Sequence, residues 1–195
     1  VGINEKGNQV FKLDVLTELN NIFHNAHDAM GDVDATIEIA KILQKSSYKV
    51  WNAGLRNNNK IDVDNFLIQN NVVCMDEYLF GKFNVHAVTY VCKNQFNYPQ
   101  CFDLLHDPID YIDMSIKDLK IKMKEKPKLI KEIKNNKNPI LLDSSVIDKM
   151  PVYQLIGMEV LTHRAEIIKN SPDFKNKIQT ILFEEYETKQ MTKSQ

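Results

Sequence analysis

The chain has 195 residues, which is enough for one large domain or two small ones, each with its own buried core. Hydrophobic residues make up 43% of the sequence and charged residues 26%, a balance typical of soluble globular proteins. The net charge of −1 excludes a general electrostatic attraction to nucleic acid, so any basic surface must be local. No apolar run approaches the roughly 20 residues that span a membrane, and we find no signal peptide.

The cysteines are odd in number, and the spacings of Cys74, Cys92 and Cys101 match no zinc or redox motif. We interpret them as reduced thiols at core strand positions, because free cysteine packs as a small hydrophobe. The sequence therefore indicates a cytoplasmic protein without a membrane partner.

Residues 10–46 are predicted to be helical in two stretches separated by a polar turn. Apolar residues recur at helical spacing before the turn and again after it, from Met30 to Ala40. The second helix is expected to start near Ala29. Residues 51–70 then become polar, which favours a linker.

The middle of the chain changes to the pattern of strands. Residues 85–92 are rich in β-branched and aromatic side chains, and residues 72–79 and 100–105 are the expected partners. Asn97 and Pro99 favour a hairpin turn between two of these strands. Further short strands are expected at 128–134 and 139–142.

The last part of the chain is predicted to be mostly helical. A helix from Ser115 to Lys126 would use Ser115 as its N-cap and end at Pro127. Residues 152–168 continue with apolar residues at helical spacing, and a further helix follows Ser171 and Pro172. The polar tail from Thr188 is expected to fray.

The clearest chemical pattern combines a loop histidine, His27, with Asp32 in the first turn of the predicted helix. Side chains lean toward a helix N-terminus, so the imidazole and the carboxylate can face one space. Such a pair suits phosphodiester hydrolysis, in which the carboxylate holds a hard divalent cation and the histidine removes a proton from water. The alternative is structural: an aspartate in a first turn is favourable against the helix dipole without any function.

The wider sequence resembles the last active-site motif of the exodeoxyribonuclease I family, which belongs to the DnaQ-like (DEDDh) 3′→5′ exonucleases. The resemblance rests on Lys12–Leu19, on Asn25–Met30, and on Gly31-Asp32-Val33 followed by Ala35-Thr36-Ile37. The family's His-x-Ala-x-x-Asp pattern is met by His27, Ala29 and Asp32. Similarity is strong at 12–43 and looser at 71–187, where Asn136–Leu141 resembles an Asn-Lys-x-Pro segment of the family.

The resemblance implies an α+β fold: the C-terminal helices of a ribonuclease H-like exonuclease domain, followed by a small SH3-like β-barrel with helical additions. The expected boundaries are 1–50 for the end of the exonuclease domain and 51–70 for the linker. The SH3-like domain with its appended helices would cover 71–187, and the polar tail 188–195.

The resemblance also implies a function: magnesium-dependent 3′→5′ degradation of single-stranded DNA in repair and recombination. His27 would be the general base and Asp32 a ligand of Mg²⁺. The family's Asp-x-Glu pair and a further Asp have no counterpart in the 26 residues before His27, so we expect the chain to be an incomplete enzyme, inactive alone. The alternative is a non-catalytic module that binds single-stranded DNA or single-strand-binding protein.

Two other readings of the histidines are weaker. His24 and His27 form a His-x-x-His pair, but no further histidine or cysteine lies close enough to complete a zinc site, so His24 is expected to be a loop residue. His27-Asp28 is also found in phosphohydrolases of the His-Asp type, but these need another histidine well upstream.

A lysine-rich segment from Lys117 to Lys137 holds nine lysines against three acidic residues. Lysines give salt-sensitive, sequence-independent binding to phosphates, but they also suit a solvated helix face or an edge strand. The candidates for DNA contact are Lys120, Lys124, Lys128 and Lys137.

The family also binds the acidic C-terminal tail of single-strand-binding protein through basic residues. Arg164 and Lys175 lie in the corresponding region and are candidates for that contact. Ordinary surface cations are the equal alternative for each of them.

Overall fold

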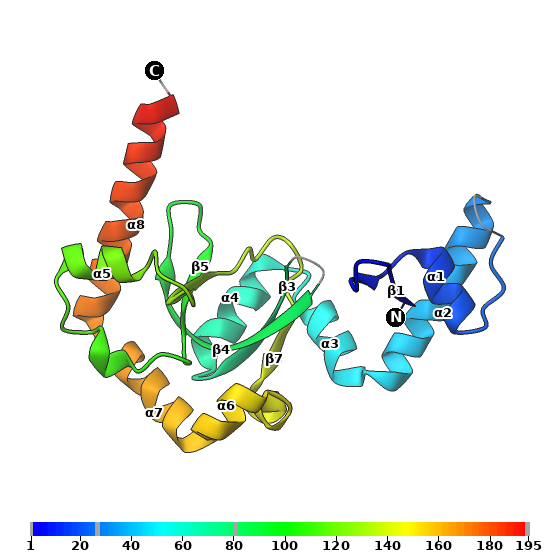
Figure 1. Cartoon of the computed structure of the whole chain (residues 1–195), viewed down its shortest axis with the longest axis horizontal. Coiled ribbons are helices and arrows are strands. Elements are labelled where there is room, and N and C mark those ends of the chain that lie inside the picture. The colour runs from blue at the N-terminus through cyan, green and yellow to red at the C-terminus, as the bar shows by residue number, and fades with distance from the viewer. Residues whose placement is uncertain (1, 26–27, 80–81, 194–195) are drawn as a thin grey trace. The chain divides into compact units, whose positions relative to one another are not determined.

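The computed structural model describes residues 2–25, 28–79 and 82–193 (Figure 1). The chain forms two compact units. The first consists of Val1–Leu55 with Glu77–Asn84, and the second of Arg56–Asp76 with Val85–Gln195. Each unit is described by itself below. The functional domain boundaries expected from the sequence stay predictions.

The first unit begins with a short antiparallel hairpin that the sequence did not predict. Its strands are β1 (Gly2–Ile3) and β2 (Gln9–Val10), with Gly2 opposite Val10. The predicted helices follow as α1 (Leu13–Leu19) and α2 (Ala29–Ser46), and α3 (Tyr48–Arg56) comes next. Residues 77–79 and 82–84 belong to the same unit, and Phe11 makes edge-to-face contacts with Tyr78 and Phe83 there.

The segment expected to be a linker is mostly helical instead, in α3 and in α4 (Lys60–Gln69). Its polar residues make specific contacts that composition does not reveal. Asn59 caps α4 by accepting hydrogen bonds from two backbone N–H groups. Asn57 is buried and donates to Pro139 O at 2.9 Å. Arg56 donates to Leu141 O and lies 3.6 Å over the ring centroid of Phe66.

The second unit is built on a five-stranded sheet in the order β6-β5-β4-β3-β7. The strands are β3 (Val73–Leu79), β4 (Lys82–Lys93), β5 (Pro99–Asp103), β6 (Ile130–Glu132) and β7 (Leu141–Asp143). The pairs β3–β7, β4–β5 and β5–β6 are antiparallel. The mixed α and β class is therefore confirmed. The SH3-like barrel is not: within the described residues, β6 and β7 are the edges of an open sheet.

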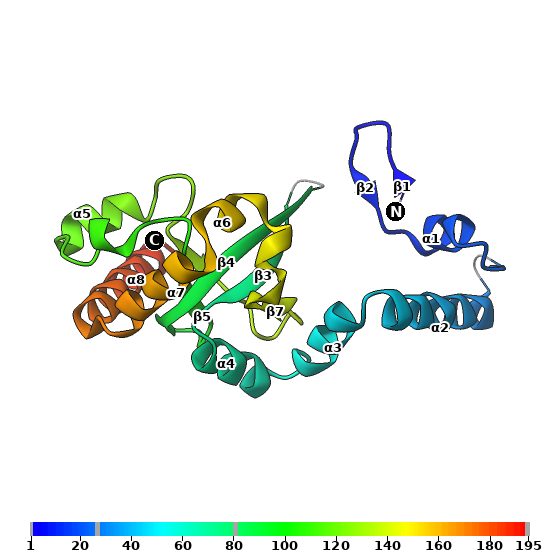
Figure 2. The same ribbon diagram turned by 90° about the horizontal axis from the view of Figure 1, so that it is seen from below.

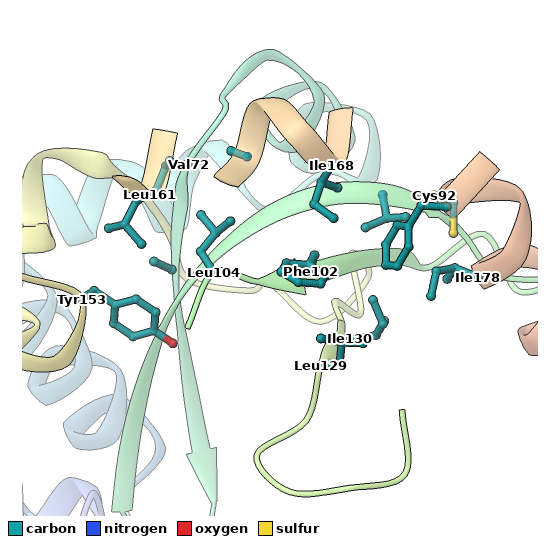
Figure 3. Close-up of a cluster of buried hydrophobic side chains, with 14 of the residues drawn as sticks. Val72, Cys92, Phe102, Leu104, Leu129, Ile130, Tyr153, Leu161, Ile168 and Ile178 are labelled. Atoms are coloured by element: carbon teal, nitrogen blue, oxygen red, sulfur yellow. The ribbon is translucent and has the colours of Figure 1, made fainter. Parts of the chain in front are cut away.

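Helices cover both faces of the sheet (Figure 2). Val63 and Leu67 of α4 pack against one face. The helices α5 (Ile116–Lys122), α6 (Pro151–Ile156), α7 (Met158–Lys169) and α8 (Pro172–Lys193) contribute to the core on the other. Phe102 lies among the side chains of that core (Figure 3). Its ring centroid lies 5.9 Å from that of Phe174.

Successive side chains of a strand point to opposite faces of the sheet, so neighbouring residues join different cores. Ala87 belongs to the core under α5–α8, and the next residue, Val88, to the core under α4. The β4–β5 register shifts between Tyr90 and Cys92, so this bulge lets Val91 and Cys92 join the same core. The largely apolar run from Ala87 to Cys92 thus belongs to a sheet that is buried on both faces.

The helices of the second unit agree with the sequence in part. Ser115 caps α5 by accepting from Asp118 N–H, as predicted, although the helix ends at Lys122. The stretch expected as one helix over 152–168 is broken at Gly157, whose φ of 88° suits glycine. The expected frayed tail is instead helical as far as Lys193. Short 3₁₀ segments occupy Pro108–Asp110 and Ser144–Lys149.

The three cysteines are free and buried, in agreement with their interpretation as core thiols. Burial raises the pKa of Cys74 to about 12 and that of Cys92 to about 11, so both stay protonated at neutral pH. In the described part of the chain, no helix combines the length and apolar character needed to cross a membrane.

Candidate functional site

The N-terminus of α2 is held by a compact set of backbone and side-chain contacts. The Asp28 carboxylate accepts from Gly31 N–H at 3.0 Å, and the Asp28 N–H donates to Asn25 O at 3.2 Å. The Asp32 N–H donates to Asp28 O at 2.9 Å, which closes the first turn. The predicted start near Ala29 is confirmed, because Asp28 is the N-cap that this sequence supplies.

Gly31 lets the preceding loop approach this turn closely. A Cβ at Gly31 would lie 2.9 Å from Asn25 O and 3.3 Å from Asp28 Oδ2. Because an ordinary side chain would push the loop away, the glycine keeps the segment before α2 against the helix end. The chain therefore places loop side chains beside the first turn.

Asp32 lies in that first turn, with its side chain 48% exposed. Its Oδ1 lies 2.7 Å from His24 Nε2. The other ring nitrogen of His24 lies 3.4 Å from the hydroxyl of Thr17, which itself donates to the carbonyls of Leu13 and Asp14. A loop histidine and a carboxylate thus meet at the helix end, but the histidine is His24.

His27, the histidine that the sequence pattern pairs with Asp32, lies outside the described residues. Its predicted role is therefore not tested. The contact of His24 was missed because it depends on how the chain reverses after α1. The Ile22 N–H donates to Thr17 O at 2.9 Å in that reversal, and sequence spacing carries no sign of it.

Asp32 suits one position of a Mg²⁺ site, because Mg²⁺ prefers carboxylate oxygens and this carboxylate is half exposed. A single carboxylate does not complete such a site. Over residues 2–25, 28–79 and 82–193, no group of three or more His, Cys, Asp or Glu side chains is arranged to hold a metal ion. The described residues therefore do not assemble a metal site by themselves, and the assignment of Asp32 to such a site stays a prediction.

The four candidate lysines differ in their surroundings. Lys120 Nζ donates to Glu184 on α8 at 2.7 Å, so its charge is partly compensated within the chain. Lys124, Lys128 and Lys137 are exposed. Lys120 lies on α5, whereas the others lie in the loops around β6. The lysines are thus spread over several segments.

The two candidates for peptide contact also differ. Arg164 on α7 donates to the carbonyls of Leu104 and Leu105 at 2.8 and 3.2 Å and pairs with Asp107 at 3.5 Å. Its side chain is 15% exposed, and both of its terminal guanidinium nitrogens are engaged within the fold. Lys175 on α8 is exposed.

A second polar cluster, which the sequence did not indicate, lies beneath α6. The Asp103 carboxylate accepts from Tyr153 Oη at 2.7 Å and lies 2.9 Å from His86 Nδ1, and Lys131 Nζ lies 3.1 Å from His86 Nε2. Burial acts to raise the pKa of Asp103, but hydrogen bonds from His86, the Leu105 N–H and Tyr153 outweigh it and leave the pKa lowered. The cluster fixes α6 to the sheet.

The chain was compared with known proteins at three levels. No family model matches it. Exodeoxyribonuclease I of Buchnera aphidicola (subsp. Schizaphis graminum) is 55% identical over 49 residues, which are 25% of this chain and 10% of that protein. The chain therefore matches only a small part of the length of such curated relatives.

Solved structures extend the similarity to the whole fold. Exonuclease I from Methylocaldum szegediense has a TM-score of 0.67 at 22% identity, covering 93% of this chain and 42% of its own. E. coli exonuclease I in complex with a dA16 oligonucleotide has a TM-score of 0.65 at 21% identity, with the same coverage. A structure described as SSB/exonuclease I with an inhibitor has a TM-score of 0.66 at 22% identity and covers 93% of this chain. The resemblance to the exodeoxyribonuclease I family is confirmed.

Proposed function

We propose, from the similarity of this chain to part of exodeoxyribonuclease I in both sequence and fold, that it forms part of a 3′→5′ exonuclease that degrades single-stranded DNA. The relatives are hydrolytic exonucleases, and one similar structure holds a dA16 oligonucleotide. The reaction is magnesium-dependent hydrolysis of the terminal phosphodiester, in repair and recombination within the cytoplasm.

The observation that carries the proposal is the position of Asp32. It combines a half-exposed carboxylate, a first helical turn and the motif by which the sequence resembles the family. One oxygen is engaged by His24, which leaves Oδ2 for a cation. Further carboxylates from outside the described residues complete the metal site. When bound, Mg²⁺ makes a coordinated water more acidic and offsets charge on the phosphate.

The remaining roles follow the family motif. His27 removes the proton from the attacking water. General-base catalysis of this kind typically raises the rate by about 10²–10⁴-fold. Asp32 positions the cation and does not exchange protons. If His27 is the base, His27→Ala lowers turnover by that factor with little loss of DNA binding, whereas an equal loss of both would make His27 structural.

In this proposal the second unit, which contains the five-stranded sheet, binds DNA and the protein partner, and its strands have an SH3-like arrangement. Exposed lysines near β6, Lys124, Lys128 and Lys137, contact phosphates, and Lys120 contributes less because Glu184 pairs with it. The acidic tail of single-strand-binding protein binds near α7 and α8. Of the two candidate cations, Lys175 suits that role better, because Arg164 already binds two carbonyls and Asp107.

A non-catalytic module that binds single-stranded DNA or its binding protein is the second candidate. Both candidates agree with the finding that the described residues bring together no metal-binding group of three. The two candidates differ in whether an Asp-x-Glu pair and another aspartate accompany this sequence in the complete protein.

The test is a nuclease assay of the complete protein that carries this sequence, on a 5′-labelled DNA strand with Mg²⁺. We expect shortening from the 3′ end that Asp32→Asn abolishes. Asp34→Asn is the matched control, because Asp34 lies on the same helix, is exposed and falls outside the motif. Full activity of the Asp32→Asn protein would exclude Asp32 from the metal site, and DNA binding without cleavage by the unaltered protein would favour the second candidate.

A further inference from the structure

His24 makes a contact with Asp32 that the family motif does not contain. Its Nε2 lies 2.7 Å from Asp32 Oδ1, a distance typical of a charge-assisted hydrogen bond. The motif residues are His27, Ala29 and Asp32, so the role of His24 is a separate question.

The two partners are buried to very different extents. The His24 side chain is 8% exposed, whereas that of Asp32 is 48% exposed. A surface ion pair would leave both groups in water and would contribute little. Here a nearly buried ring contacts a carboxylate whose side chain is about half exposed. The ring therefore acts as a fixed support and the carboxylate as the accessible group.

The His24 ring is itself held in place on the side away from Asp32, through its Nδ1. Thr17 is 2% exposed and lies 3.4 Å from the second ring nitrogen of His24. The Thr17 hydroxyl lies 2.9 Å from Leu13 O and 2.8 Å from Asp14 O within α1, which fixes its position. With the His24 proton on Nε2, Nδ1 is an acceptor that competes with these two carbonyls for the single hydroxyl proton of Thr17. The contacts run in series from α1 through Thr17 and His24 to the first turn of α2. Each link restricts the rotation of the next group.

We propose that His24 is a positioning residue for the Asp32 carboxylate. Its Nε2–H donates to Oδ1 and sets the direction of Oδ2, the oxygen that binds the divalent cation. The proposal rests on the proposed function, since it assigns Asp32 to the metal. Outer residues that orient metal-binding carboxylates typically contribute about 10–100-fold in metal affinity or activity, and His24 belongs to this class.

The position of Nε2 also predicts which side chains can take over the hydrogen bond of His24 to Asp32 Oδ1. A glutamine at this position carries its amide nitrogen at the reach of the imidazole Nε2 and can donate to Oδ1, whereas alanine cannot. His24→Gln therefore restores most of what His24→Ala loses. Because glutamine also keeps most of the side-chain volume, His24→Leu is the volume control: leucine fills a similar space without a donor, so it should behave like His24→Ala if the hydrogen bond to Oδ1 is what matters.

The first readout is metal binding by the complete protein, measured by the electron paramagnetic resonance of Mn²⁺ used in place of Mg²⁺. We expect His24→Ala to weaken Mn²⁺ binding by about 10–100-fold and His24→Gln to recover most of it. The matching nuclease assay should show a higher Mg²⁺ concentration for half-maximal rate in His24→Ala, with the DNA KM nearly unchanged. His163→Ala, an exposed histidine on α7, is the control and should change neither value.

The second readout needs no activity. In ¹⁵N-histidine NMR spectra of the complete protein without metal, the Nε2–H of His24 should exchange slowly with water, and Asp32→Asn should shift its signal. Absence of this signature, or equal Mn²⁺ binding by His24→Ala and the unaltered protein, would overturn the positioning role. If the signature is present while the unaltered protein binds no Mn²⁺ and cleaves no DNA, the contact stands and the metal assignment of the proposed function fails.

Discussion

Helix α2 and the five-stranded sheet bury their apolar residues to very different extents. Of the 18 residues of α2, only Ala35 is buried, while Met30 and Ile37 are 66% and 46% exposed. The sheet has packed side chains on both faces, with Phe102 fully buried. The part of the chain that carries the candidate chemistry is therefore the part that contributes least to the described core.

This contrast indicates that the residues that stabilise the fold and the candidate functional residues lie in different parts of the chain. The second unit contains the buried clusters that can support cooperative folding. The first unit positions Asp32 and His24 by local contacts, with an apolar helix face toward solvent. Exposed apolar faces of this kind mark surfaces that other protein segments cover. The predictions below test whether the two regions differ as described.

The largest effect is expected from the sheet core. Phe102→Ala should lower the free energy of unfolding by about 3–5 kcal/mol, because it leaves a cavity among Phe174, Tyr111 and the surrounding side chains. Ile37→Ala on α2 should change it by about 0.5 kcal/mol or less. Urea unfolding followed by circular dichroism measures both. Equal losses would show that α2 is as well packed as the sheet.

An intermediate effect is expected at the polar cluster beneath α6. Tyr153→Phe removes a 2.7 Å hydrogen bond to the buried Asp103 carboxylate and should cost about 1–3 kcal/mol. The matched control is Tyr48→Phe on α3, where the side chain is 65% exposed and little change is expected. Thermal and urea unfolding of the two variants give the comparison.

The same cluster predicts how stability depends on acid. The pKa of Asp103 is lower in the folded than in the unfolded protein, so its contribution is complete above the unfolded value of about 3.9. That contribution should disappear as pH falls through the folded pKa. Asp103→Asn should flatten this part of the curve of unfolding free energy against pH. An unchanged acid limb in Asp103→Asn would contradict the assignment.

The smallest effect concerns the lysines. If Lys124 contacts a phosphate, Lys124→Ala should reduce the slope of log K against log salt for single-stranded DNA by about 0.7. Lys120→Ala should change it less, because Lys120 is paired with Glu184. Fluorescence titrations of a labelled oligonucleotide at several salt concentrations measure both slopes. A larger change for Lys120→Ala would reverse their assignment.

The sequence predicted correctly those helices and strands that depend on residues close together in the chain. The β-branched run at 85–92 predicted β4, and apolar residues at helical spacing from Met30 predicted α2 with a start near Ala29. The supposed linker failed because Arg56 and Asn57 bind backbone carbonyls more than 80 residues away, which composition cannot show. The polar composition of this segment suggested exposure to solvent, but Asn57 is buried and both residues bind backbone carbonyls.

The candidate site was predicted only in part for the same reason. Asp32 could be found from its motif and its place in the first turn, and the structure places it as expected. His24 is a loop residue, as predicted, but its contact with Asp32 depends on the reversal of the chain after α1, which the sequence does not show. The role of His27 stays a prediction, and the SH3-like barrel came from the family resemblance and not from any pattern of the strands.

The central claim is that Asp32 supplies one part of a metal site whose other ligands lie outside the described residues. The most direct measurement compares the purified 195-residue chain with the complete protein on a 5′-labelled single strand in Mg²⁺. We predict 3′→5′ shortening by the complete protein and none by the 195-residue chain. Digestion by the 195-residue chain that Asp32→Asn abolishes would contradict the claim, as would a complete protein that binds the strand without shortening it.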